Sequence, residues 1–318
     1  MENKQRYQQF CEQETQMPLF FQPYWLDAVS AGKQWDVLIV ADTDDSVLAA
    51  MPYVIERTLG MRYIETPPQT PLMGVWIRYD RQASPDTQRD VCMKLSEQLR
   101  ELNLAWLSQQ FPADSTLPLV WQHLDFKLKE TSVFMLDTIL DLDKTLDACS
   151  KNVKRQLQKA LTLQAAYTTE PEDFFRFQQE CFQLRKKTNP FSRESFLVLQ
   201  KKTERTQQSA MLRIQNSNAE TVAEAFLVWD NRVLYFLLPT LAPAYADSGA
   251  AALLVWETVK LAQQKALQLC FSPLSTKAFP FNYKQVGAKP HTASVIRKYY
   301  KGFFRVINFF RLLATIGK

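Results

Sequence analysis

The stretch YADSGAAALLVWETVKLAQQ, residues 245–264, holds residue types that could bind an anion. Asp247 or Ser248 can cap a helix that Gly249 begins. A helix N-terminus presents unpaired N–H groups and a partial positive charge. Small residues leave the backbone of this first turn uncovered, at Gly249, Ala250 and Ala251. We therefore expect an anionic group to approach the chain closely here; the alternative is a helix that is merely well capped.

A second stretch, SKNVKRQLQKAL at residues 150–161, places cations at helical spacing. Lys151, Lys154 and Arg155 would share one face of a helix, with an apolar stripe opposite. Such a face could bind a phosphorylated acceptor or RNA. A solvated face would give the same pattern.

The charged residues are distributed unevenly along the 318-residue chain. No acidic residue follows Glu257, whereas eleven of the 38 Lys and Arg residues do. This asymmetry indicates an anionic partner for the C-terminal part, such as a phosphorylated cofactor, a nucleic acid or an anionic membrane surface. A solvated basic surface is the alternative.

Cysteine and histidine usage gives no sign of metal chemistry. The five cysteines are far apart and never form a C-x-x-C pair, and only two histidines occur, His123 and His291. The sequence therefore predicts reduced cysteines and no metal site. The N-terminus, MENKQRYQQF, is too polar for a secretory signal, and no apolar run reaches the roughly 18 residues of a membrane span. We expect a cytoplasmic protein.

Apolar periodicity predicts the same order of elements twice, at an offset far above that of solenoid repeats. Each half begins with helices and continues with three or four hairpin-connected strands. A helix, a strand, a short helix and a strand follow. The sequence thus predicts an α/β fold of two duplicated domains, with mixed, mostly antiparallel sheets flanked by helices. The expected domains are residues 1–145 and 146–300, followed by an apolar basic tail at 301–318.

This order resembles the GNAT acyltransferase fold. Two such units in one chain, with YFLLPTLAPAYADSGAAALLVWETVKLAQQKALQLCFS followed by FNYKQVGA in the second, are similar to the FemAB-like, or acetyltransferase-6, branch of the GNAT superfamily. That branch includes peptidoglycan-bridge aminoacyltransferases.

The resemblance implies a site for an acyl donor. GNAT proteins bind the pyrophosphate of acyl-CoA with a Q/R-x-x-G-x-G/A loop after a strand like RVLYFLLPT. Here Gly249 and Ala251 match that loop, and Ala246 replaces its basic residue. The resemblance implies that residues 247–251 contact the donor, as does the strand through Tyr235 and Leu237.

The resemblance also implies catalytic roles. Tyr283 lies four residues before Gly287, like a tyrosine that protonates the departing thiolate in GNAT enzymes. The matching first-half positions are Trp121 and Asp125: indole cannot act as that acid, whereas Asp can adopt the left-handed turn that glycine fills. We therefore predict an active second domain and a degenerate first one. Glu224 is the candidate acceptor of the amine proton.

Three functions follow from these features. The first is an N-acyltransferase that moves an acyl group from acyl-CoA to an amine of a small or cell-envelope-related acceptor. The second takes the acyl group from aminoacyl-tRNA and adds it to a cell-envelope precursor, which clustered cations would favour. The third is a non-catalytic binding protein with two decayed GNAT domains.

The tail KGFFRVINFFRLLATIGK mixes phenylalanines and aliphatic residues with cations. It is too short and too often interrupted to span a bilayer. It could lie in an anionic membrane interface, which would place the protein at the inner face of the membrane. Alternatively, its phenylalanines pack against the second domain and close its core.

Overall fold

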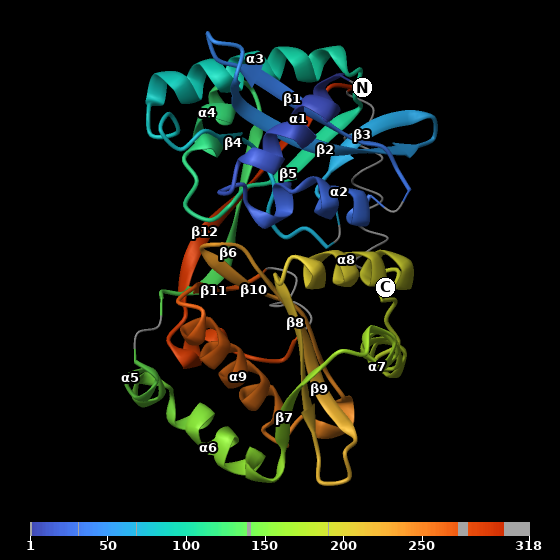
Figure 1. The fold of residues 1–318 in the computed structure, drawn as a ribbon, viewed down its shortest axis with the longest axis vertical. Helices are drawn as coiled ribbons and strands as arrows, with labels where there is room; N and C mark the ends of the chain where they lie inside the picture. The colour runs from blue at the N-terminus through green and yellow to red at the C-terminus, as the bar shows by residue number, and fades with distance from the viewer. Residues whose placement is uncertain are drawn as a thin grey trace. The chain divides into compact units, whose positions relative to one another are not determined.

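The computed structural model describes residues 2–30, 32–67, 69–138, 141–189, 191–272 and 279–301. The chain forms two compact units (Figure 1). Unit 1 comprises Met1–Thr131 and Thr292–Lys318, and unit 2 comprises Ser132–His291.

Unit 1 is a mixed sheet with helices on both faces. Its elements are α1 (Glu2–Gln13), η1 (Leu19–Phe21), α2 (Pro23–Val29), β1 (Trp35–Ala41), β2 (Val47–Thr58), β3 (Met61–Glu65), β4 (Trp76–Ile77), α3 (Pro85–Glu101), β5 (Trp106–Gln110), α4 (Leu117–His123) and most of β12 (Lys289–Tyr299). The strands are ordered β1-β2-β3-β5-β12; β3 and β5 run parallel and the other neighbours antiparallel. One core joins the sheet to α3, and another joins it to α1 and α2.

Unit 2 repeats this plan. Its elements are the end of β6 (Lys127–Leu136), α5 (Leu142–Ala148), α6 (Lys151–Lys159), η2 (Ala160–Thr162), β7 (Gln164–Thr168), α7 (Pro171–Leu184), α8 (Arg193–Arg205), β8 (Ser209–Gln215), β9 (Thr221–Trp229), β10 (Val233–Leu241), η3 (Pro243–Tyr245), α9 (Ala250–Gln264), β11 (Gln268–Phe271) and η4 (Tyr283–Val286). The strands are ordered β6-β11-β10-β9-β8-β7, and only β10 and β11 run parallel. The predicted α/β class with mixed, mostly antiparallel sheets is confirmed.

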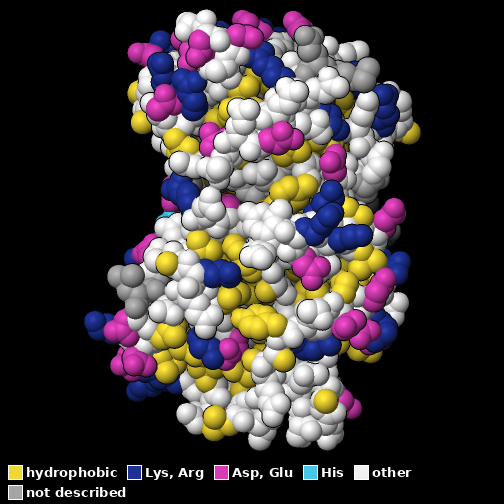
Figure 2. Space-filling model, in the orientation of Figure 1, with side chains coloured by type: hydrophobic (Ala, Val, Ile, Leu, Met, Phe, Trp, Pro, Cys, Tyr) yellow, Lys and Arg dark blue, Asp and Glu magenta, His cyan; other side chains and the backbone are white. Residues whose placement is uncertain are grey.

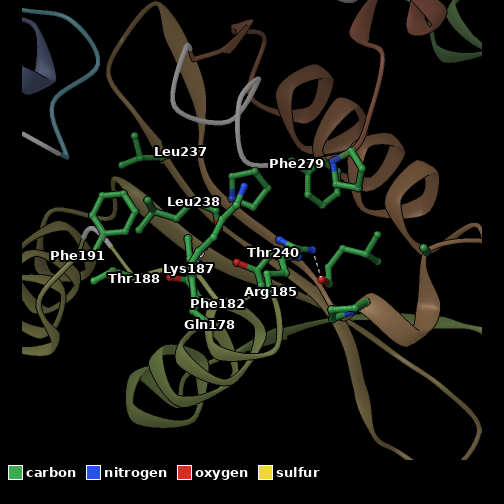
Figure 3. Close-up of a pocket in the computed structure, with 15 residues that line it drawn as sticks. Gln178, Phe182, Arg185, Lys187, Thr188, Phe191, Leu237, Leu238, Thr240 and Phe279 are labelled. Carbon is green, nitrogen blue, oxygen red and sulfur yellow. Dashed lines mark hydrogen bonds between the residues drawn. The ribbon is translucent and has the colours of Figure 1, made fainter. Parts of the chain in front are cut away.

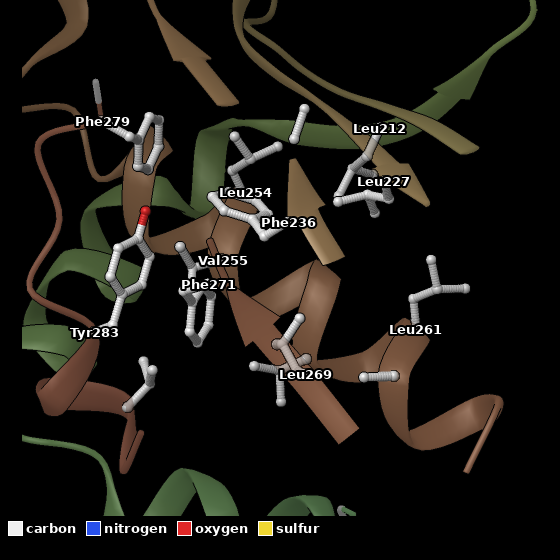
Figure 4. Close-up of a cluster of buried hydrophobic side chains, with 14 of the residues drawn as sticks. Leu212, Leu227, Phe236, Leu254, Val255, Leu261, Leu269, Phe271, Phe279 and Tyr283 are labelled. Atoms are coloured by element: carbon white, nitrogen blue, oxygen red, sulfur yellow. The ribbon is translucent and has the colours of Figure 1, made fainter. Parts of the chain in front are cut away.

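The near-continuous apolar runs of β9 and β10 reflect burial on both faces of the sheet. On one face, Phe236 and Leu227 pack with Leu254 of α9 (Figure 4). On the other face, the ring of Phe226 contacts Phe174 of α7 and Phe196 of α8, with ring centroids 6.4 and 5.3 Å away. Helices α7 and α9 are therefore held on opposite faces of β10.

The last strand of unit 1 comes from the segment that follows unit 2 in the sequence. In unit 1, β12 pairs antiparallel with β5, from Val295 opposite Gln110 to Tyr299 opposite Trp106. In unit 2, β6 pairs antiparallel with β11, so that Leu136 lies opposite Leu269. Consequently the compact units are not the contiguous segments 1–145 and 146–300. A duplication with a boundary at residue 145 stays a prediction, because the division into compact units does not show which segments arose as repeats.

The matched turn of the two repeats is confirmed. Asp125 has φ +64° and Gly287 has φ +87°, and both follow a short helix that contributes a buried aromatic ring. Trp121 is fully buried and Tyr283 is 2% exposed. The predicted tail lies outside the described residues, apart from the exposed Lys301. In the part of the chain that is described, no helix is both long and apolar enough to cross a bilayer.

Candidate active site

A pocket of about 650 Å³ lies beside the C-terminal half of β10 in unit 2 (Figure 3). Helix α7 and the segment after it form one wall, β10 forms another, and the approach to α9 closes one end. The described lining residues are Gln178, Phe182, Arg185, Lys187, Thr188, Phe191, Leu237, Leu238, Pro239, Thr240, Leu241, Pro243, Ala246, Phe279 and Pro280.

A β-bulge shapes the β10 wall. The pairing of β10 with β11 extends from Val233 to Phe236. At this point the register with β9 also shifts, because Phe236 lies opposite Leu227 and Leu238 lies opposite Phe226. Leu237 is the extra residue between them, and it lines the pocket. The bulge thus turns the backbone of β10 where the pocket begins.

Gln178 of α7 and Arg185, the residue that directly follows α7, hold the backbone of β10. Gln178 Nε2 donates a hydrogen bond to the Leu238 carbonyl at 3.0 Å, and Arg185 donates to the Leu241 carbonyl at 2.5 Å. Gln178 is only 1% exposed. Among the described residues, no donor lies within hydrogen-bond distance of its Oε1 atom.

The pocket is apolar with cations at one side. Phenylalanine, leucine and proline side chains dominate its lining, and no described lining residue is acidic. Arg185 is half-buried and Lys187 is exposed. An apolar chain that carries an anionic group fits this combination.

The approach to α9 differs from the sequence-based expectation. Helix α9 begins at Ala250, with Gly249 as its N-cap residue at φ +85°; Ser248 Oγ accepts from the Ala250 N–H at 3.2 Å. A Cβ atom on Gly249 would lie 2.1 Å from the Gln156 carbonyl oxygen of α6. Gly249 and Ala250 are buried, so the expectation of an uncovered backbone was wrong at both. The partly buried Ala251 follows, and the exposed Asp247 precedes this junction.

Residues 148–279 match the family model of the acetyltransferase (GNAT) domain. This match spans α9 and every residue that lines the pocket except Pro280. We call this matched segment the GNAT domain. No curated protein matches the sequence at a significant level.

Solved structures extend the likeness beyond this GNAT domain. A structure of FemX has a TM-score of 0.68 at 9% identity and covers 92% of this chain and 95% of its own. A tandem GNAT protein from the clavulanic acid biosynthesis pathway has a TM-score of 0.53 at 10% identity, covering 93% and 95%. The C-terminal domain of a putative lysylphosphatidylglycerol synthetase from Agrobacterium fabrum has a TM-score of 0.55 at 8% identity, covering 92% of each chain. The resemblance to the FemAB-like branch is therefore confirmed as a shared two-domain fold.

Tyr283 lies four residues beyond the matched segment, in the core of unit 2 rather than in the lining of the pocket. Its ring stacks on Phe271, with centroids 4.1 Å apart. Its hydroxyl points toward Phe279, which does line the pocket (Figure 4). Tyr235 is buried on β10 opposite Cys270 of β11, and it is not a lining residue. A catalytic role for Tyr283 stays a prediction.

Glu224 lies one strand away from the pocket. It is fully buried on β9, opposite Thr240, which lines the pocket, and opposite Arg213 of β8. Burial raises the pKa of its carboxyl well above the ordinary value; the nearby Arg213 opposes this shift. Glu224 Oε1 has no hydrogen-bond donor among the described residues.

The basic face of α6 is not part of the pocket. Lys151 and Arg155 are exposed, and Arg155 donates to the Asn152 side chain at 3.0 Å. Lys154 donates to the Asp147 carbonyl at 3.1 Å. Binding of a phosphorylated acceptor or RNA by these three cations stays a prediction.

Several cations that follow Glu257 interact with residues from earlier in the chain. Lys289 pairs with Asp137 at 3.0 Å, and Lys260 pairs with Glu257 at 2.6 Å. Lys265 lies over the ring of Trp229, with its Nζ atom 4.2 Å from the centroid. Figure 2 shows basic, acidic and apolar side chains interspersed on one face of the molecule. Asymmetry along the sequence therefore does not by itself produce a basic surface.

The described residues contain no group of three or more His, Cys, Asp or Glu side chains that could hold a metal ion. Burial raises the pKa of the Cys270 thiol to about 12, which disfavours the nucleophilic thiolate.

Sequence reasoning missed the α7 wall. Gln178, Arg185 and Lys187 precede the β10 lining by 50 residues or more, as the 60-residue separation between Gln178 and Leu238 illustrates. The run RKKTN at residues 185–189, directly after an amphipathic helix, was the available signal. It marks a cluster of cations at a helix C-terminus, where favourable interaction with the helix dipole alone could account for it.

Proposed function

We propose that the GNAT domain is an N-acyltransferase that moves an acyl group from acyl-CoA to an amine of a small or cell-envelope-related acceptor. The observation that carries this proposal is the apolar pocket beside the bulged end of β10, with Arg185 and Lys187 in its lining. The acyl chain and the thioester arm of the donor lie along the apolar walls. A phosphate group of the donor meets the cations.

In the proposed reaction, the amine nitrogen attacks the thioester carbonyl carbon. The backbone N–H of Leu237 at the bulge donates a hydrogen bond to the developing oxyanion. The C–N bond forms, the C–S bond breaks, and the Tyr283 hydroxyl protonates the departing thiolate. The pocket contributes mainly by holding the two reactants in contact.

Glu224 is the proposed acceptor of the amine proton. A raised pKa makes its carboxylate a stronger base, which supports this role, and its neighbour Thr240 lines the pocket. Because Glu224 itself does not line the pocket, the proton would reach it through a water molecule.

Calorimetric titration of the full chain with acetyl-CoA tests the donor. We expect saturable binding that is lost when Leu237 is replaced by Trp, which would fill the pocket, and retained in Leu59→Trp at an exposed turn. Binding should be accompanied by amine-dependent release of free thiol from acetyl-CoA. Absence of both binding and thiol release by the wild-type protein would contradict the proposal.

Aminoacyl-tRNA is the alternative donor, with a cell-envelope precursor as acceptor. One observation favours it: α6 covers the start of α9, where the pyrophosphate of acyl-CoA would otherwise be expected to bind. The shared fold with FemX and with the domain of a putative lysylphosphatidylglycerol synthetase also supports this alternative.

Filter binding at a series of salt concentrations distinguishes this alternative. Aminoacyl-tRNA binding should weaken steeply with salt and exceed the binding of deacylated tRNA. If neither donor binds, the non-catalytic alternative is favoured.

A further inference from the structure

The buried amide of Gln178 has one hydrogen bond and one open acceptor. Its Nε2 atom donates to the Leu238 carbonyl at 3.0 Å, which fixes the orientation of the amide. Its Oε1 atom has no donor among the described residues, although the side chain is only 1% exposed and lines the pocket. A buried acceptor without a donor destabilises the folded chain. A ligand in the pocket that carries an N–H group would remove this cost.

The spacing along α7 adds a second recognition point. Gln178 lies in α7 and Arg185 directly follows the last residue of this helix, seven positions later, which corresponds to about two helical turns and about 10 Å along the axis. Both side chains reach β10 and both line the pocket. Arg185 uses one N–H for the Leu241 carbonyl, and a guanidinium carries five. The α7 wall therefore presents an N–H acceptor and a cation at a fixed separation.

We propose that Gln178 is a donor-binding residue whose Oε1 accepts a hydrogen bond from an amide N–H of the thioester arm, while Arg185 binds a phosphate of the same molecule. This inference rests on the proposed function, because it takes acyl-CoA as the donor. The apolar side chains between the two points, including Phe182 and Leu241, contact the hydrocarbon part of the arm. The ligand class is an acylated thiol that carries a secondary amide and, about two helical turns away, a phosphate.

The experiment combines variants of the protein with variants of the ligand. The ligands are acetyl-CoA, acetyl-pantetheine without phosphates, and an acetyl-pantetheine analogue in which an ester oxygen replaces the N–H of the amide nearest the thioester. The proteins are the wild type, Gln178→Met, Gln178→Glu and Arg185→Gln, each as the full chain. Calorimetry measures Kd, and thermal unfolding checks that each variant is folded.

The expected pattern separates recognition from structural support. Gln178→Met should weaken both acetyl-CoA and acetyl-pantetheine roughly tenfold and leave the ester analogue unchanged. Gln178→Glu keeps an acceptor oxygen and should bind more tightly than Gln178→Met. Arg185→Gln should weaken acetyl-CoA about 10- to 100-fold and leave acetyl-pantetheine unchanged.

Two results would overturn the inference while the proposed function stands. One is wild-type binding of acetyl-CoA that Gln178→Met does not weaken. The other is an equal loss for the amide and ester ligands, which would assign Gln178 only to support of Leu238. If Gln178→Met fails to fold, the test is made on the wild type alone. The inference then requires the wild type to bind acetyl-pantetheine about tenfold more tightly than the ester analogue, and equal Kd values for the two ligands would overturn it. Failure of the wild type to bind acetyl-CoA would instead refute the proposed donor itself.

Discussion

Arg213 lies directly opposite Glu224 on the adjacent strand, with its Nε and Nη2 atoms each 3.3 Å from Glu224 Oε2. The glutamate is fully buried, whereas Arg213 retains 14% side-chain exposure. Burial dominates over this pairing and raises the pKa of the Glu224 carboxyl. Burial of the Glu224 carboxyl is therefore a source of pH-dependent stability beneath the wall of the pocket.

We expect Glu224→Gln to gain stability relative to the wild type as the pH rises. Because the folded-state pKa of Glu224 is raised, its favourable contribution is fully present below the unfolded-state pKa and is lost as pH rises through the folded-state pKa. Glutamine removes that loss. Urea denaturation at about pH 5 and about pH 8 measures the effect. The exposed Glu204→Gln is the control. A difference in unfolding free energy between Glu224→Gln and the wild type that is the same at both pH values would contradict this expectation.

Gly249→Ala should destabilise the protein by about 2–5 kcal/mol, through left-handed strain together with overpacking. The added Cβ would lie 2.1 Å from the Gln156 carbonyl oxygen. Gly287→Ala is the matched control, because its φ of +87° is nearly the same and its nearest contact would be 3.8 Å. It should cost only about 1–2 kcal/mol. Equal losses in denaturant unfolding would show that the approach of α6 to α9 is looser than described.

Tyr283→Phe should lower kcat about 100-fold with little change in the KM for acetyl-CoA, since the hydroxyl acts as the thiolate leaves. The stacking on Phe271 is kept, so unfolding should change by less than about 1 kcal/mol. Steady-state thiol release measures both constants. Tyr300→Phe removes another buried hydroxyl and serves as the control. An unchanged kcat for Tyr283→Phe would restrict Tyr283 to packing.

Ala246→Arg should tighten acetyl-CoA binding roughly tenfold, because it adds a cation to the lining of the pocket at the position where the GNAT loop pattern has a basic residue. Acetyl-pantetheine, which lacks phosphates, should be unaffected. Ala244→Arg places the same charge at an exposed position that does not line the pocket. Calorimetry with both ligands measures the effect. Equal tightening by the two variants would indicate a general charge effect rather than a local contact.

Local patterns predicted local structure. The order of elements in both halves follows from apolar periodicity, except for the mostly exposed strand β7 between α6 and α7, which was not predicted. The left-handed turns at Asp125 and Gly287 follow from the residue types that tolerate them. Burial of Gly249 could not be predicted in this way. Its neighbour Gln156 lies almost a hundred positions earlier, and small residues are equally consistent with an open backbone and with one packed tightly against another element.

The pairing of the strands and the residues of the pocket wall also could not be predicted from a single sequence. Periodicity identifies β12 as a strand but does not state that Tyr299 lies opposite Trp106. Gln178 and Arg185 were not recognised because a glutamine and an arginine on an amphipathic helix are usually solvated. Their role depends on the carbonyls of Leu238 and Leu241, which only the fold brings within reach.

The return of the chain to unit 1 through β12 also constrains how the protein is synthesised. Arg297 of β12 donates to Ser108 of β5 across 189 residues of sequence, so the sheet of unit 1 gains this edge only after the whole of unit 2 has been translated. Until then the ribosome-bound nascent chain exposes the backbone groups of β5, a surface prone to mispairing. In unit 2 the order of synthesis is reversed, because β6 is synthesised before the other strands of its sheet. It is therefore available for pairing when β11 leaves the ribosome. Unit 2 can therefore close its sheet during synthesis, while unit 1 lacks its last strand until β12 has been made.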